Sequence, residues 1–170
     1  MSTTESTLES TNFLQPTGFK VIINRKRFKN LEFFAQSVQH PSVSAGPAIA
    51  PFRGTNLPLP GDKLEYSSLA MEVILDENMN VYREMLEWLK FVVLENNKPR
   101  SLQTSASEDL TSYDIRLAIL SSHNNTTDTI TYKDSFPVDL GTINFQSNVD
   151  GVNYVTVPVT FAYSSFDLTD

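Results

Sequence analysis

The sequence has no cysteine, no long apolar run and few basic residues. Without cysteine among its 170 residues, disulfide bonds and thiolate metal sites are excluded. No stretch approaches the roughly 18 apolar residues that a membrane-spanning helix needs. The N-terminal MSTTESTLES is polar and acidic, unlike a secretory signal peptide. We therefore expect no membrane partner.

Basic residues are outnumbered by acidic ones. The 13 Lys and Arg face 20 Asp and Glu, which gives a net charge of −7. Tight nucleic-acid binding depends on clustered cations that neutralise phosphates, and the chain has one such cluster, NRKRFK at 24–29. We interpret this cluster as a solvated turn between two strands. The composition thus argues against a nucleic-acid-binding protein.

Catalytic residues are also scarce. The two histidines are His40, which precedes a proline, and His123, which lies in a polar turn. Neither has an evident carboxylate or serine partner, and no nucleophile-elbow, phosphate-loop, metalloprotease or dinucleotide motif occurs. The sequence predicts no catalytic residues, no cofactor site and no metal site, and therefore a protein that is not an enzyme.

What the sequence does contain is alternating apolar patterning. Hydrophobic residues make up 40% of the chain, which predicts one well-cored domain over residues 13–170. Residues 1–12 lack periodicity and are expected to form a mobile N-terminal arm. The fold class expected is mainly β: an antiparallel two-sheet sandwich or barrel with one flanking helix. Strands are expected at 18–24 and 31–38 (forming a hairpin), 63–76, 113–120 and 128–134 (a second hairpin), and 139–148 and 154–168 (a third).

One segment has two possible interpretations. DENMNVYREMLE (76–87) places Asp76, Asn78, Asn80 and Glu87 at four positions of an EF-hand calcium loop. Position 6 of such a loop needs glycine, and here it is the β-branched Val81. From Val81 the apolar residues also recur every three or four positions. We therefore predict a helix at about 79–95, capped by Asn78 or Asn80, with Trp88 in the core and not on a ligand-binding surface.

A proline-rich segment, 39–62, interrupts this pattern. It holds five of the nine prolines and three of the six glycines, which predicts a long loop without regular strand pairing. It is too apolar for a solvated linker. We interpret it as a docking loop.

Three stretches resemble a known family. LEYSSLAMEVILDENMNVYREMLEWL (64–89), INFQSNVDGVNYVTVPVTFAY (143–163) and NFLQPTGFKVIIN (12–24) are similar to the tail tube proteins of contractile-tailed bacteriophages. The resemblance implies a two-sheet barrel with a flanking helix, assembled as stacked hexameric rings around a DNA channel. It also implies sheath and baseplate proteins as partners, production in the host cytoplasm and a place in the virion tail.

The resemblance gives the docking loop a role between subunits. An acidic subunit repels phosphates, so DNA is expected to pass through the tube without sequence-specific binding. Two alternatives remain: a baseplate tube initiator with the same fold, and a monomeric β-sandwich that binds carbohydrate or protein through the same loop. The expected inter-subunit contact residues are Val43, Ile49, Phe52, Arg53, Leu57 and Leu59.

Overall fold

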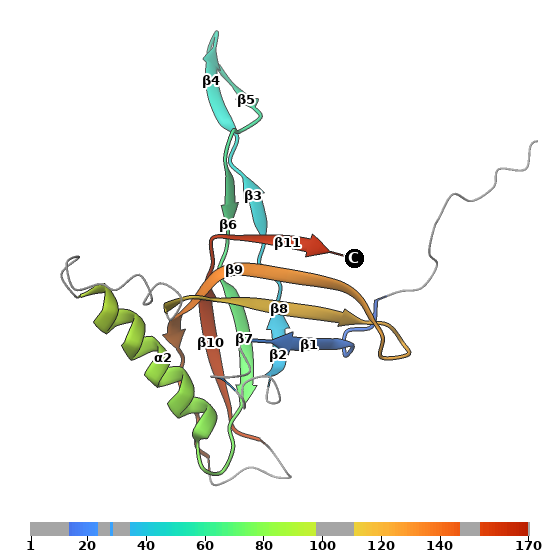
Figure 1. Ribbon diagram of the computed structural model, residues 1–170. Coiled ribbons are helices and arrows are strands. Elements are labelled where there is room, and N and C mark those ends of the chain that lie inside the picture. The colour runs from blue at the N-terminus through green and yellow to red at the C-terminus, as the bar shows by residue number, and fades with distance from the viewer. Residues whose placement is uncertain (1–13, 24–27, 29–34, 98–110, 147–153, 170) are drawn as a thin grey trace, which may run out of the picture.

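The protein is mainly antiparallel β-structure with one described helix (Figure 1). The computed structural model describes residues 14–23, 28, 35–97, 111–146 and 154–169. The expected N-terminal arm and most of the basic cluster lie outside these residues. The fold class predicted from the sequence is confirmed, with an open sheet in place of a closed barrel.

The main sheet has seven strands in the order β1-β8-β9-β10-β7-β2, and β11 also pairs with β9. Because β1 and β2 are the two ends of this order, the sheet is not closed. Their bounds are β1 Phe19–Ile22, β2 Ala35–Gln39, β7 Leu69–Ile74, β8 Tyr113–Leu120, β9 Thr126–Leu140, β10 Thr156–Ala162 and β11 Ser165–Thr169.

Strand β9 joins two layers of this sheet. Its residues 129–133 pair with β11, and its residues 136–140 pair with β10. Between them Asp134 has a φ of 53°, in the left-handed region. Before Asp134 the buried residues are the even-numbered Ile130 and Tyr132, and after it they are the odd-numbered Ser135 and Pro137. The one extra residue at the bend therefore keeps the buried face of β9 toward the core.

Helix α2 (Asn80–Asn96) covers the core beside these layers (Figure 1). Its buried apolar residues are Val81, Met85, Trp88 and Val92, at the three- and four-residue spacing expected of an amphipathic helix. Trp88 is 0% exposed, stacks on Phe28 with ring centroids 4.6 Å apart and donates its indole N–H to the carbonyl of Thr111 at 3.0 Å. The helix and the core position of Trp88 are confirmed.

The start of α2 differs from the prediction in its cap. Met79, with a φ of 53°, occupies the N-cap position and makes no side-chain cap bond. Instead the Asp76 carboxylate accepts the backbone N–H of Val81 at 3.3 Å and the side-chain amide of Asn80 at 2.8 Å. A carboxylate at this end of a helix is favoured by the helix dipole. Asn78 and Asn80 are thus not the cap.

Two of the three predicted hairpins need correction. Strands β1 and β2 do not pair, because β1 pairs with β8 and β2 with β7. The third does not form as predicted, since residues 141–146 are not a strand and 154–168 is divided between β10 and β11. The β8–β9 hairpin is confirmed. Alternation identifies the buried face of a strand but not its partner, which is set by packing far along the chain.

The predicted loop at 39–62 is largely a two-stranded β-ribbon. We call residues 43–66 the β-ribbon: β3 (Val43–Ala45) pairs with β6 (Leu64–Tyr66), and β4 (Ala48–Phe52) pairs with β5 (Thr55–Leu59). The prolines misled the prediction because each strand of a two-stranded ribbon has one unpaired edge. Proline is tolerated wherever its missing N–H would point to that edge.

Candidate inter-subunit surface

The β-ribbon projects from the main sheet between β2 and β7 (Figure 1). Its tip is a two-residue turn of Arg53 (φ 43°) and Gly54 (φ 83°) between the paired residues Phe52 and Thr55. Positive φ at both central residues is typical of the type I′ turn, whose twist matches that of paired strands. The sequence therefore builds a regular hairpin here.

Between the two strand pairs of the β-ribbon, the backbones approach closely. A Cβ atom on Gly61 would overlap the carbonyl oxygen of Gly46. Only glycine fits at this point, so Gly61 allows the outer hairpin to continue from the β3–β6 pair.

The predicted contact residues lie on the β-ribbon, and the five whose side chains are described are exposed. Ile49 is 66% exposed, and Val43, Leu57 and Leu59 are also classed as exposed large apolar side chains. Arg53 lies at the tip, and the side chain of Phe52 is outside the described part of the structure. These residues share one element but not one face.

Opposite residues of a paired ribbon point to the same face, and successive residues alternate. One face of the outer hairpin carries Ala48, Ala50, Leu57 and Leu59, and the other carries Ile49, Pro51, Pro58 and Asn56. Both faces are therefore predominantly apolar. An element with two apolar faces in solvent is typical of a segment that a partner covers.

Two further residues of this surface were missed in the sequence. Leu64 is 60% exposed and Tyr66 is 39% exposed, both in β6. The alternating pattern of the sequence predicted one long strand, 63–76, with both residues on its buried face. The structure instead places them at the base of the β-ribbon, before β7 begins at Leu69. The Ser67-Ser68 pair was the available signal of a break between the strands.

The base of the β-ribbon is fixed by polar bonds. The backbone N–H of Ser67 donates to the carbonyl of Ser42 at 3.1 Å, and the Ser42 N–H donates to Ser67 Oγ at 2.8 Å. His40, just before the ribbon, shares a 2.7 Å hydrogen bond between its Nδ1 and the Tyr132 hydroxyl on β9. These bonds hold the ribbon to the body of the subunit.

An aromatic cluster surrounds that histidine. Tyr66 lies against Tyr163 and Phe166, with ring centroids 6.1 and 5.7 Å apart, and His40 lies 5.0 Å from the ring of Phe166. Burial, and then the neighbouring Tyr163, raises the pKa of the Tyr132 phenol well above its ordinary value. Burial, and then Tyr66, also raises the pKa of Tyr163. Tyr132 and Tyr163 therefore lose their phenolic protons at a higher pH than an ordinary tyrosine does.

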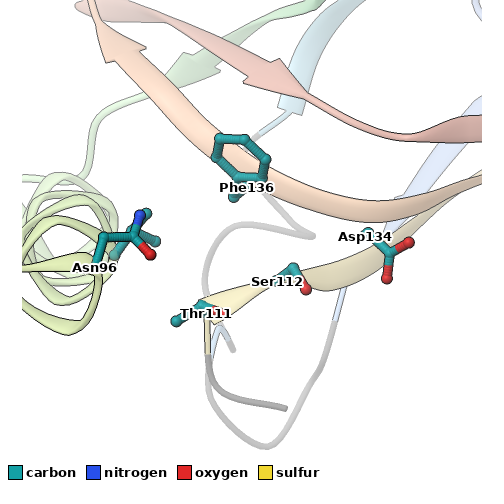
Figure 2. A pocket seen from close by; sticks show the side chains of 6 residues that line it. Asn96, Thr111, Ser112, Asp134 and Phe136 are labelled. Atoms are coloured by element: carbon teal, nitrogen blue, oxygen red, sulfur yellow. The ribbon is translucent and has the colours of Figure 1, made fainter. Parts of the chain in front are cut away.

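A small pocket lies on another part of the subunit (Figure 2). It has a volume of about 240 Å³ between the end of α2, the start of β8 and the bend of β9. Among its described lining residues, the carboxylate is that of Asp134, which accepts a 2.8 Å hydrogen bond from the Ser164 hydroxyl. Neither histidine is among its described lining residues. The lining residues are Val92, Asn96, Thr111, Ser112, Asp134 and Phe136.

Other classes of site find no support in the described residues. They contain no group of three or more histidines or acidic side chains placed to hold a metal ion. None of the helical segments that the structure describes has the length and apolarity of a membrane span. The exposed β-ribbon is therefore the feature that points to a function.

Comparisons with known proteins agree on one family. The family model described as "Phage tail tube protein" matches residues 6–169. A tail tube protein of Serratia phage KSP90 is 29% identical over 107 residues, which are 63% of this chain. The chain spans 58% of the length of that curated relative.

Solved structures share the fold. A chain of the sheath-tube complex of an extracellular contractile injection system in its extended state has a TM-score of 0.62 at 12% identity, with 94% of this chain and 93% of that chain covered. A chain of the anti-feeding prophage baseplate has a TM-score of 0.60 at 15% identity, with 94% and 97% covered. At these identities the likeness shows the fold alone.

Proposed function

Because this chain belongs to the phage tail tube protein family, a family of structural and non-enzymatic proteins of the virion tail, we propose that it forms the inner tube of a contractile tail. Hexameric rings of the chain stack along the tube axis, and DNA passes through the channel.

The observation that carries this proposal is the exposed β-ribbon. A ribbon with apolar side chains on both faces is unfavourable in water, and burying it gains about 25 cal/mol for each Å² of apolar surface removed from solvent. Repeated around a ring, the same small contact gives a firm junction between rings, because each contact helps to hold the others in place. The ribbon is also pre-paired, so little chain ordering opposes the contact.

The negative net charge of the chain supports a role as the wall of a DNA channel. The net charge is −7, and a wall of acidic subunits repels DNA phosphates instead of retaining them. DNA would then slide through without sequence-specific binding.

The proposed partners are the tail sheath and the baseplate. The solved structures named above come from a sheath-tube complex and a baseplate, and both chains share the fold of this one. A baseplate tube initiator remains the alternative function, and polymerisation of the purified chain into long tubes is what distinguishes a tube subunit from it.

Substitutions on one face of the β-ribbon test the proposal. Leu57→Ser together with Leu59→Ser removes two exposed apolar side chains from the same face, so we expect tube formation, measured by high-speed pelleting, to fall strongly. The melting temperature should change little because neither residue contributes to the core. Asn56→Ser, a polar exchange on the opposite face, is the matched control. Wild-type yields of tubes from the double variant would contradict the proposal.

A further inference from the structure

The two prolines within the paired strands of the β-ribbon occupy the same class of position. Hydrogen-bonded and non-hydrogen-bonded pairs alternate along an antiparallel ladder. A two-residue turn makes its closing pair, Phe52 with Thr55, a hydrogen-bonded pair. Pro51 with Asn56 and Pro58 with Ile49 lie one and three steps further, so both are non-hydrogen-bonded pairs.

In a non-hydrogen-bonded pair the backbone N–H groups point away from the partner strand. The outward positions on β4 are Ile49 and Pro51, and those on β5 are Asn56 and Pro58. Because proline has no N–H, each outer edge of the hairpin keeps one backbone donor. An added strand would need a donor at every second residue of the edge, and neither edge supplies that.

We propose that Pro51 and Pro58 close both edges of the outer hairpin (residues 48–59) to strand addition, so that this part of the ribbon contacts neighbouring copies of the chain through its two faces and not through a shared ladder. This inference rests on the proposed function, since it specifies how the ribbon joins one subunit to the next.

Neighbouring copies are the occupant that the surface chemistry favours. Between residues 43 and 61 the one charged side chain is Arg53 at the tip, while the chain as a whole carries −7. An apolar ribbon with a basic tip is therefore complementary to a surface that is apolar and acidic. The body of the same chain exposes apolar side chains of its own, among them Val93, Leu94 and Val138.

Closed edges would prevent the ribbons of unassembled subunits from pairing with other chains. A free two-stranded hairpin with apolar faces and open edges is a template for pairing with other chains and for aggregation. One missing donor on each side blocks that route at no cost to the internal ladder. The faces stay available for assembly.

Restoring the donors tests the proposal. Pro51→Thr with Pro58→Thr supplies an outward N–H on each edge and introduces a residue that favours strands. Ala48→Thr with Ala50→Thr is the matched control, because the N–H groups of Ala48 and Ala50 already point into the ladder. Both proteins would be compared by sedimentation velocity and thioflavin fluorescence, below the concentration at which the wild type forms tubes.

We expect the proline variant to form concentration-dependent, thioflavin-positive multimers and the alanine variant to sediment like the wild type. Each single variant, Pro51→Thr or Pro58→Thr, opens one edge and should stop at dimers, which keeps the test available if the double variant does not fold. The proposal would be overturned if neither the proline variant nor the alanine variant self-associated. It would also be overturned if both self-associated to the same extent. Tube formation by the wild type is scored separately, so failure of the proposed function is distinguishable from failure of this inference.

Discussion

At the scale of single residues, the core depends most on Trp88. Its ring is fully buried against Phe28, Tyr113 and Phe161, and its N–H is satisfied by a backbone carbonyl. Trp88→Ala should lower the free energy of unfolding by about 3–5 kcal/mol, the usual range for a large aromatic side chain. Phe145→Ala, which removes a 74% exposed ring, is the control and should change little. An unchanged midpoint of urea unfolding for Trp88→Ala would contradict this account of the core.

Tyr132 gives a second prediction at this scale. Burial raises the pKa of its phenol, so the folded state keeps the neutral form after the unfolded chain begins to ionise. The stabilisation is complete below pH of about 10, the ordinary tyrosine value, and is lost as the pH rises above it. We expect the free energy of unfolding to fall with alkaline pH more steeply in the wild type than in Tyr132→Phe.

The control for that measurement is Tyr154→Phe, because Tyr154 is 70% exposed. This variant should keep the wild-type slope. Identical alkaline slopes for Tyr132→Phe and the wild type would show that the buried phenol does not contribute to the pH dependence of stability.

At the scale of elements, the spacing of apolar residues predicted the bounds of helix α2 but not its N-terminal cap. The three- and four-residue spacing from Val81 gave α2 to within one residue at each end, and Val81 in the sixth position of the calcium motif correctly favoured the helix. The cap was missed because the αL conformation of Met79 moves that role to Asp76. The left-handed conformation of Met79 cannot be inferred from the amino-acid composition or from the spacing of apolar residues.

In the β-ribbon, the sequence pattern did not predict the secondary structure. Four of the apolar residues predicted to contact a neighbouring subunit are exposed, but the strands of the ribbon were predicted as a loop because proline was taken as evidence against pairing. The spacing of the prolines was the signal that pairing is possible. Pro51 and Pro58 lie two and four residues from the Arg53-Gly54 turn, and both occupy positions whose backbone N–H would point away from the partner strand. Partners of β1 and β2 were not predictable in this way, since β8 and β7 lie far along the chain.

At the scale of the whole molecule, an acidic body of two sheet layers and a helix carries an apolar ribbon that the subunit does not cover (Figure 1). The core and the ribbon are separate among the described side chains: the core residues belong to the main sheet, α2 and residues 23 and 28, and none of them belongs to residues 43–66. Folding and assembly should therefore respond to different substitutions.

Electron microscopy of the purified chain, beside a variant with residues 47–60 replaced by a short Gly-Ser link, shows whether the chain forms tubes and whether the ribbon is needed for them. We expect six-fold tubes for the wild type, with the ribbon of each subunit against the next ring. For the variant we expect dispersed particles that keep a β-type circular dichroism spectrum and a nearly unchanged melting temperature, because the replaced strands lie outside the described core. Dispersed single subunits of the wild type at every concentration, or long tubes of the variant, would contradict the proposed function.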